Sequence, residues 1–335
     1  MRLALDAMGG DHAPQPIVAG ALEALHANPN LHLTLVGDSE AIGELVPSDA
    51  PAERLRIVHT TQVVGMAESP VDAIRGKPDS SISGCWKLLA DKEVDGVVSA
   101  GNTGAMVAGG LRSRRFLPNV RRPGICAFMP TAKGLSLVVD VGANVAPKPS
   151  HLYQYGVMGL IFARHFFNKP NPTVGLLNIG EEAGKGNELT QRAYVLLKNG
   201  LKDHFVGNIE GRDVHQGVCD VIVTDGFVGN VILKLSEGVL DFLMHSIVKQ
   251  VIGPLPNDQE FAMKALKKLI AEYDYTSFGG GPLLGVDGAC VICHGSSKEV
   301  AIRNALAFGA KFVESKINEK IVQELEQLPQ PKDDE

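Results

Sequence analysis

The sequence predicts an α/β protein in which helices cover both faces of a mainly parallel sheet. Two features predict this class. Short apolar runs of strand length alternate with longer helical patterns along most of the chain, and this alternation is typical of βαβ units. Glycine is frequent, at 37 of 335 residues, and many glycines directly follow the apolar runs, where such a sheet places its turns and ligand loops.

The apolar runs and helical patterns give an order of elements. Strands are expected at 3–7, 31–36, 55–58, 96–99, 124–129, 135–141, 174–179, 205–209, 221–224 and 289–293. Helices are expected at 14–28, 80–92, 104–116, 150–168, 187–199, 229–252 and 297–325. The runs at 124–129 and 135–141 are separated only by residues 130–134, so they predict a local antiparallel hairpin. Since no linker or repeat interrupts this order, residues 1–326 are expected to form a single unit, either undivided or as two lobes with a cleft between them. A flexible acidic tail is expected at 327–335.

Charge and hydropathy exclude several classes of protein. The net charge of −6 argues against a general nucleic-acid binder. No apolar run in the sequence reaches the 18 residues expected of a membrane-spanning helix. Asp6 interrupts the first apolar run too early for a signal-peptide core, so the default expectation is a cytosolic protein.

The five cysteines are expected to be free thiols, because their number is odd and no secretory signal precedes them. Cys290 and Cys293 have the spacing of a redox motif or half a zinc site. They lie inside an apolar run without a second cysteine pair, which favours two small apolar side chains on a buried strand. No metal site is expected.

The first fourteen residues contain the densest group of candidate functional residues. A short apolar run ends in a carboxylate, a glycine pair, a second carboxylate and a histidine, and a proline then opens a helix: Asp6, Gly9, Gly10, Asp11, His12 and Pro14. Glycine lets the backbone approach a ligand closely or adopt a positive φ, so the loop suits an active site. The alternative is a strand end followed by an aspartate-rich turn that begins the next helix.

Five junctions between a strand and a helix share one composition of small residues with asparagine, serine or threonine, at 99–104, 140–144, 180–188, 224–230 and 293–297. Backbone N–H groups at a helix N-terminus, with hydroxyls beside them, form an anion site. A single junction of this kind is weak evidence, because these residues are also ordinary N-caps. Five along one parallel sheet would open at the same edge, and they predict a crevice for phosphate and a polar carbonyl compound.

The segment 180–187 is not a P-loop. Three residues rather than four separate Gly180 from Gly184, and Gly186 stands where the motif needs a hydroxyl. No dinucleotide fingerprint follows any expected strand. Lys185 remains a flexible cation in a glycine-rich loop, and the alternative is an ordinary solvent-exposed lysine.

Together, Asp6–Pro14, the 180–188 loop, Asp225–Asn230 and His294–Ser297 resemble the PlsX family, the acyl-ACP:phosphate acyltransferases of bacterial phospholipid synthesis. The resemblance spans nearly the whole chain. It implies an α/β/α sandwich related to phosphotransacetylases and to isocitrate and isopropylmalate dehydrogenases. It also implies transfer of a long acyl chain from acyl carrier protein to inorganic phosphate, a homodimer, and peripheral association with the membrane where a glycerol-3-phosphate acyltransferase works.

This chemistry needs no cofactor. The enzyme must hold phosphate against a thioester carbonyl, stabilise an oxyanion and protonate a thiolate. The candidate catalytic residues are Lys185, His12, Asp225 and Asn230. The candidate residues for binding phosphate or the acyl thioester are Asp6, Gly9, Gly10, Gly101, Asn102, Thr103, Gly104, Asn144, His294, Gly295, Ser296 and Ser297. Direct attack by phosphate is favoured over a cysteine-bound acyl intermediate.

Two basic regions suggest partners. An arginine cluster is expected to dock the acidic acyl carrier protein, or else to form a solvated helix end that complements the helix dipole: Arg112, Arg114, Arg115, Arg121 and Arg122. An amphipathic helix at 257–273 is flanked by lysines and suits either a membrane surface or a packed interface. We expect Leu255, just before this helix, and the apolar side chains of the helix to face lipid, the latter being Phe261, Leu266, Leu269 and Ile270.

Three other functions stay open on the sequence alone. The first is a short-chain phosphotransacylase that uses coenzyme A, and the second is a decarboxylating dehydrogenase with a metal at Asp6, Asp11 or Asp225. The third is a non-enzymatic scaffold at the membrane, which the many glycine-framed polar loops disfavour.

Overall fold

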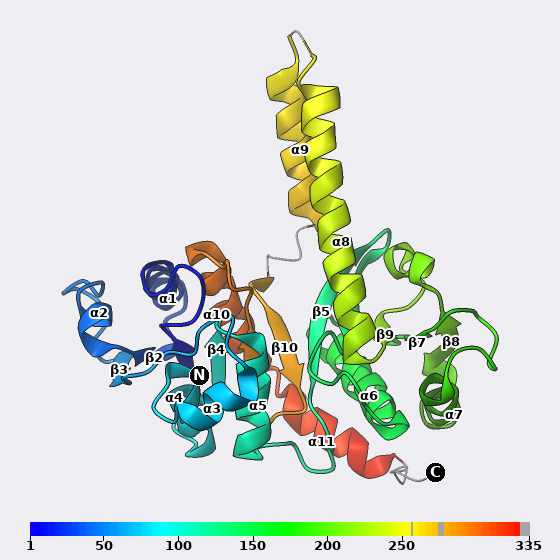
Figure 1. Ribbon diagram of the computed structural model, residues 1–335, viewed down its shortest axis with the longest axis horizontal. Coiled ribbons are helices and arrows are strands. Elements are labelled where there is room, and N and C mark those ends of the chain that lie inside the picture. Colours follow the sequence, from blue (N-terminus) through cyan, green and yellow to red (C-terminus); the bar gives the residue numbers. More distant parts are fainter. Residues whose placement is uncertain (256, 274–277, 329–335) are drawn as a thin grey trace.

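The computed structural model describes residues 1–255, 257–273 and 278–328, and contains one 11-stranded sheet covered by helices (Figure 1). Its strands are β1 (Arg2–Asp6), β2 (His32–Gly37), β3 (Leu55–His59), β4 (Gly96–Ser99), β5 (Gly124–Thr131), β6 (Gly134–Val139), β7 (Val174–Leu177), β8 (Phe205–Ile209), β9 (Val221–Val223), β10 (Gly281–Leu284) and β11 (Ala289–Ile292). The order across the sheet is β3-β2-β1-β4-β11-β10-β5-β6-β9-β7-β8.

The helices are α1 (Gln15–Ala27), α2 (Ser39–Gly43), α3 (Pro70–Gly76), α4 (Ser81–Ala90), α5 (Thr103–Ser113), α6 (Pro149–Phe166), α7 (Glu188–Leu201), α8 (Gly226–Ile247), α9 (Gln259–Tyr273), α10 (Glu299–Glu314) and α11 (Ile317–Gln327). Short 3₁₀ segments occupy Lys202–His204 and Gly211–Gln216, and a π-helical segment at Val248–Ile252 extends α8.

All ten expected strands are present, and the hairpin is confirmed as the antiparallel pair β5–β6. β10 was not expected, because three glycines precede its short apolar run. The single helix expected at 297–325 is two helices, α10 and α11, because the chain adopts a left-handed conformation at Lys316 (φ 52°). Most of the tail expected at 327–335 lies outside the described residues.

The two halves of the sheet run in opposite directions. β2, β1, β4 and β11 are mutually parallel, whereas β10 is antiparallel to both β11 and β5, and β5 is antiparallel to β6. β6, β9, β7 and β8 are again parallel to each other, and they run against β4. The expectation that all five polar junctions open at one edge is therefore wrong. The carboxyl ends of β4 and β11 lie at one edge, and those of β6, β7 and β9 lie at the other.

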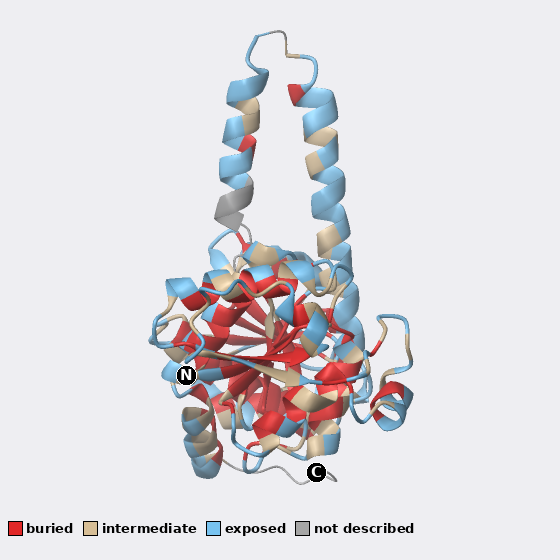
Figure 2. Cartoon of the chain, turned by 90° about the vertical axis from the view of Figure 1, so that its left-hand side faces the viewer, coloured by how far each residue is buried: buried red, intermediate tan, exposed pale blue. Residues whose placement is uncertain are grey.

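The core lies on both faces of this sheet, where the buried residues of Figure 2 concentrate. α6 is its most buried helix, and its phenylalanines pack with a ring from β5 and another from α10: Phe162 and Phe166 contact Phe308, and Phe162 contacts Phe128. The five cysteines are free and buried. The expectation of two buried, small apolar side chains is confirmed for Cys290 and Cys293. Cys290 lies in β11, and Cys293 directly follows the strand.

α8 and α9 project together from the body of the protein as a helical pair (Figure 1). Most of their surface is exposed (Figure 2). Of the helices within the described residues, none is both long and apolar enough to cross a membrane.

Candidate functional site

The first candidate residue, Asp6, is a buried carboxylate that holds the loop after β1. It has no exposed surface. Ser99 Oγ donates to Asp6 Oδ2 (2.7 Å), and the Met8 backbone N–H donates to Asp6 Oδ1 (3.2 Å). Burial raises the pKa of this carboxyl, and these hydrogen bonds oppose the rise. Asp6 therefore anchors the loop and presents no atom to a ligand in this conformation.

Three loops meet at the carboxyl ends of β1, β4 and β11, and we call residues 6–12, 99–104 and 293–297 the first loop cluster. The Asp11 backbone N–H donates to the Gly295 carbonyl (2.8 Å). Gly9 packs so closely that a Cβ there would lie 2.7 Å from the Gly101 nitrogen, so any larger residue would separate the loops. The glycines that the sequence places in this loop therefore allow the loop backbones to pack closely against each other.

The first loop cluster presents polar groups to solvent at the N-terminus of α5. Asn102 caps this helix by accepting from the Ala105 N–H (2.9 Å), which leaves the Thr103 hydroxyl exposed beside the first helical N–H groups. His294 Nδ1 lies 2.8 Å from Ser296 Oγ, and both residues are exposed. His12 is exposed on the adjoining loop. An open helix N-terminus with hydroxyls and imidazoles beside it can bind an anion and exchange a proton with it.

A second buried carboxylate, Asp140, organises the junction after β6. It accepts from the backbone N–H groups of Ile125 (3.0 Å), Ala143 (2.9 Å) and Asn144 (2.7 Å), while burial raises its pKa. In the sequence, Asp140 is only the first residue of a polar junction, with no signal that singles it out. Its burial and its number of backbone donors could be found only in the structure.

Asn144, Asp225 and Asn230 gather around Asp140. Asn144 Nδ2 donates to the Pro123 carbonyl (2.7 Å) and to the Tyr155 hydroxyl (2.8 Å), so this amide nitrogen already has partners. Asp225 caps α8 by accepting from the N–H groups of its first turn. Asn230 is exposed on that helix, with its Oδ1 near Gly142.

Lys185 lies in the loop between β7 and α7, with its side chain 49% exposed and Nζ 3.9 Å from Glu182 Oε2. Asn178 Nδ2 donates to the Lys185 carbonyl (3.1 Å) and thereby fixes the loop backbone. Gly186 adopts φ +88°, and a Cβ there would lie 2.1 Å from Thr190 Oγ1. The lysine is accessible at its tip on a backbone that is held in place.

Residues 140–144, 178–187 and 224–230 form what we call the second loop cluster. The structure brings Asp6, Gly9, Gly10 and His12 together with 101–104 and 294–297. It does not bring these to Lys185, Asn144, Asp225 or Asn230, because the strands that carry the second loop cluster run in the opposite direction.

The arginine cluster also divides. Arg112 and Arg114 are exposed at the C-terminal end of α5, about 15 Å along the helix from Thr103 at 1.5 Å per residue. Arg115 is paired with Asp287 (2.9 Å). Arg121 and Arg122 precede β5 on the side of the second loop cluster, where the Arg121 N–H donates to Gln154 Oε1 (3.0 Å).

The apolar positions near the tip of the helical pair have unequal exposure. Phe261 is 76% exposed and Leu269 49%, whereas Leu266 is only 8% exposed. The expectation that Leu266 faces lipid is therefore wrong, because side-by-side helices cover part of each other's surface. Leu255 is half-buried, and the Ile270 side chain lies outside the described part of the chain.

Comparisons with known proteins agree with this architecture. The family described as "Fatty acid synthesis protein" matches residues 1–320. The phosphate acyltransferase of Brevibacillus brevis is 44% identical over 97% of this chain and 98% of its own length, and that of Desulforamulus reducens is 45% identical with the same coverage.

Among solved structures, a phosphotransacetylase from Streptococcus pyogenes superimposes with a TM-score of 0.62 over 94% of each chain, at 16% identity. A branched-chain phosphotransacylase from Enterococcus faecalis V583 gives 0.56 over 93% of this chain and 99% of its own, at 15% identity. These structures confirm the phosphotransacetylase-related fold. Because the curated relatives match nearly the whole sequence, the chain belongs to the PlsX family of phosphate acyltransferases and is an acyltransferase of lipid synthesis.

Proposed function

We propose that this protein transfers a long-chain fatty acyl group from acyl-[acyl carrier protein] to inorganic phosphate, giving acyl phosphate for the acylation of glycerol 3-phosphate. The observation that carries the proposal is the first loop cluster. This chain belongs to the phosphate acyltransferase family. Its three loops converge beside the open N-terminus of α5, where Thr103 and Ser296 are exposed.

The first loop cluster suits direct attack by phosphate. The N–H groups at the start of α5 and the Thr103 hydroxyl would hold the phosphate. A phosphate oxygen attacks the thioester carbon, the C–S bond breaks, and His294 or His12 donates a proton to the leaving thiolate. The nearest thiol, Cys293, is buried, and burial raises its pKa to about 12. This supports a mechanism without a cysteine-bound acyl intermediate.

Mass spectrometry tests the activity directly. Incubation with long-chain acyl-ACP and phosphate is expected to give acyl phosphate, and acetyl-CoA is expected to be a poor donor. Turnover of acetyl-CoA without turnover of acyl-ACP would favour a short-chain phosphotransacylase instead.

Two variants test the position of the phosphate. Thr103→Val removes the hydroxyl at the start of α5, and Ser296→Ala removes the partner of His294. Both are expected to raise the KM for phosphate more than the KM for acyl-ACP, because each removes a donor to the anion. Unchanged phosphate dependence in both variants would reject the first loop cluster as the phosphate site.

We further propose that the acyl carrier protein docks at the C-terminal end of α5. Arg112 lines a cavity of about 290 Å³ together with Lys87 and Trp86, so cations border an apolar floor that suits an acidic partner. Arg112→Glu with Arg114→Glu is expected to weaken acyl-ACP binding and flatten its salt dependence. Arg115 is left intact because it pairs with Asp287. Equal salt slopes in variant and wild type would move the docking surface elsewhere.

We also propose a homodimer and peripheral contact with the membrane, which the family resemblance implies. Support for the dimer is an exposed apolar stripe on α8, formed at intervals of three or four residues by Phe227, Val231, Leu235, Val239 and Phe242. Such spacing is typical of helices that pack against each other. Support for membrane contact is at the tip, where Val251 and Phe261 are exposed near Lys264, Lys267 and Lys268.

A further inference from the structure

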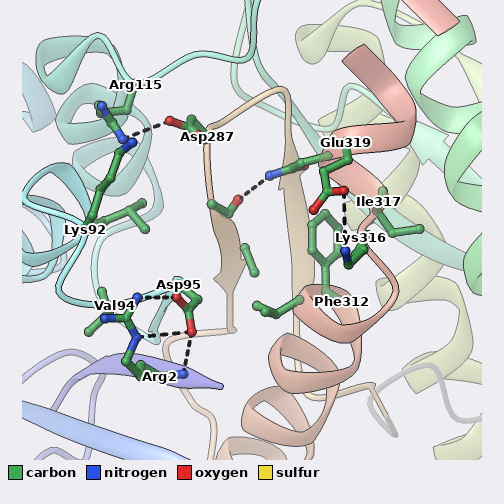
Figure 3. Close-up of a pocket in the computed structure, with 15 residues that line it drawn as sticks. Arg2, Lys92, Val94, Asp95, Arg115, Asp287, Phe312, Lys316, Ile317 and Glu319 are labelled. Carbon is green, nitrogen blue, oxygen red and sulfur yellow. Dashed lines mark hydrogen bonds and ion pairs between the residues drawn. The ribbon is translucent and has the colours of Figure 1, made fainter. Parts of the chain in front are cut away.

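A cavity of about 340 Å³ lies at the amino ends of β1, β4 and β11, opposite the first loop cluster (Figure 3). Its wall is built from five parts of the chain: the start of β1, the end of α4 with the turn after it, the segment after α5, the turn between β10 and β11, and the junction of α10 with α11. The residues that matter for the argument are Arg2, Lys92, Asp95, Arg115, Asp287 and Asn318. None of them belongs to the site proposed above for acyl transfer.

Not every charged side chain in this cavity has an ion-pair partner. Arg2 and Asp95 form a closed pair, with Arg2 Nη2 2.6 Å from Asp95 Oδ1, and this contact contributes to the lowered pKa of Asp95. Arg115 Nη2 lies 2.9 Å from Asp287 Oδ2, and Lys316 Nζ lies 3.7 Å from Glu319 Oε2. Lys92, by contrast, has no ion pair with any described carboxylate. Figure 3 shows its side chain running toward Arg115, so two cations face one carboxylate here.

Two polar atoms in the wall are buried without a hydrogen-bond partner in the described part of the structure. One is a donor, Arg115 Nε, and the other is an acceptor, Asn318 Oδ1. The Asn318 side chain is held in place, because its Nδ2 donates to the carbonyls of Val286 (2.9 Å) and Gly288 (3.2 Å). Buried polar groups nearly always have partners, so each of these atoms leaves the wall one hydrogen bond short.

Two lysines in the wall have an unusual backbone conformation. Lys92 (φ 59°) and Lys316 (φ 52°), which both line the cavity, adopt the left-handed conformation. Glycine occupies this conformation without a steric cost, yet both positions carry a lysine. Both lysines directly follow the end of a helix, where a left-handed residue is common, so glycine is expected to be tolerated at either position.

We propose that this cavity binds a small organic phosphate that carries a hydroxyl group. The phosphate lies between Lys92 and Arg115, and the hydroxyl lies on the side of Asn318, which lines the same cavity. Apolar atoms of Leu89 and Phe312 complete the wall. The site is distinct from the catalytic phosphate site, because β1, β4 and β11 separate the two along their length.

Titration calorimetry of the whole protein with sn-glycerol 3-phosphate tests the site, with glycerol as the probe that lacks the phosphate. The variant Lys92→Gly/Lys316→Gly removes two cations at positions whose φ suits glycine, so it is expected to fold. Lys202→Gly is the matched control, because Lys202 also has a positive φ (48°) and lies outside the cavity.

Wild type and Lys202→Gly are expected to bind glycerol 3-phosphate saturably, and the double variant at least tenfold more weakly, while glycerol shows no binding. Thr103→Val is expected to bind like wild type, which separates this site from the proposed catalytic one. Equal affinity in the double variant and the control, or equal affinity for glycerol, would overturn the proposal. Because binding is measured without acyl transfer, the result does not depend on the proposed function.

Discussion

At the scale of single residues, the two buried aspartates, Asp6 and Asp140, show how carboxylates can organise a site without touching its ligand. Each accepts backbone or hydroxyl hydrogen bonds at the end of a strand, and each is fully buried. The exposed groups that remain for chemistry are carried on the loops that these aspartates fix.

Replacing Lys185 tests whether the second loop cluster takes part in the reaction. If its ammonium group stabilises charge in the transition state, Lys185→Ala is expected to lower kcat roughly 10²–10³-fold, as the loss of one oxyanion donor does. The measurement is steady-state acyl phosphate formation by a variant with an unchanged melting temperature. Lys202→Gly serves as the control for losing an exposed lysine. A kcat above about a third of wild type would identify Lys185 as a surface lysine and leave the reaction to the first loop cluster.

Asp220 provides a pH-dependent prediction at the same scale. Lys169 Nζ contacts its carboxylate, and the Thr173 N–H donates to it (2.8 Å), and these interactions lower its pKa despite partial burial. A lowered folded-state pKa stabilises the protein above the ordinary aspartate value of about 3.9, and this stability is lost as the pH falls through the lowered value.

Asp220→Asn is therefore expected to lower the free energy of unfolding at pH 7 by about 1.5–3 kcal/mol, the range for hydrogen bonds to charged groups. The difference from wild type should shrink as the pH falls below 4. Urea unfolding at several pH values measures it. A difference that stayed constant down to the most acidic pH would show that the charge of Asp220 contributes nothing.

At the scale of elements, α9 carries both exposed and buried apolar side chains. Phe261 is exposed and Leu266 is buried although both lie on the same helix. Phe261→Glu is expected to reduce liposome binding with little change in melting temperature, because the side chain is in water before it meets lipid. Leu266→Glu is expected to destabilise the protein, because it buries an unpaired charge.

Co-sedimentation with anionic liposomes and a melting curve, applied to both variants, measure these effects. Leu269→Glu provides a second exposed position for comparison. Full lipid binding by both the Phe261 and Leu269 variants would show that this surface does not contact the membrane.

At the scale of the whole molecule, the projecting pair of helices exposes many apolar side chains to water, which is unfavourable unless a partner covers them. The α8 stripe continues from Phe227 at the base of the helix to Phe242, which is 69% exposed. A long exposed apolar stripe indicates an interaction surface, and a second copy of this helix presents the matching stripe. This length extends beyond what a membrane contact at the tip would cover.

If two copies pair through α8, charges placed in the stripe are expected to lower the molecular mass of the protein in solution. Leu235→Asp with Phe242→Asp is expected to convert a dimer to a monomer in sedimentation equilibrium, because the double variant places two charges in the apolar stripe. Val195→Asp changes another exposed apolar residue, on α7, and is expected to leave the mass of the dimer unchanged. A monomeric wild type, or a double variant that remains dimeric, would contradict this role for α8.

The sequence by itself determined the local features of this protein. The positions of ten strands, the hairpin β5–β6, the buried cysteines and the loop glycines all follow from periodicity, turn residues and side-chain size, which act over a few neighbouring residues. The family could also be identified, because its motifs are local.

The tertiary structure alone decided which of these local features meet. The unexpected strand β10 and the hairpin reverse the direction of half the sheet, so Lys185 and Asp225 lie at the opposite edge from Asp6 and Thr103. Likewise, Leu266 is buried and Asp6 serves as an anchor only because of what packs against them. Strand direction and burial depend on pairings between residues far apart in the chain, and neither is encoded in the residues of one segment.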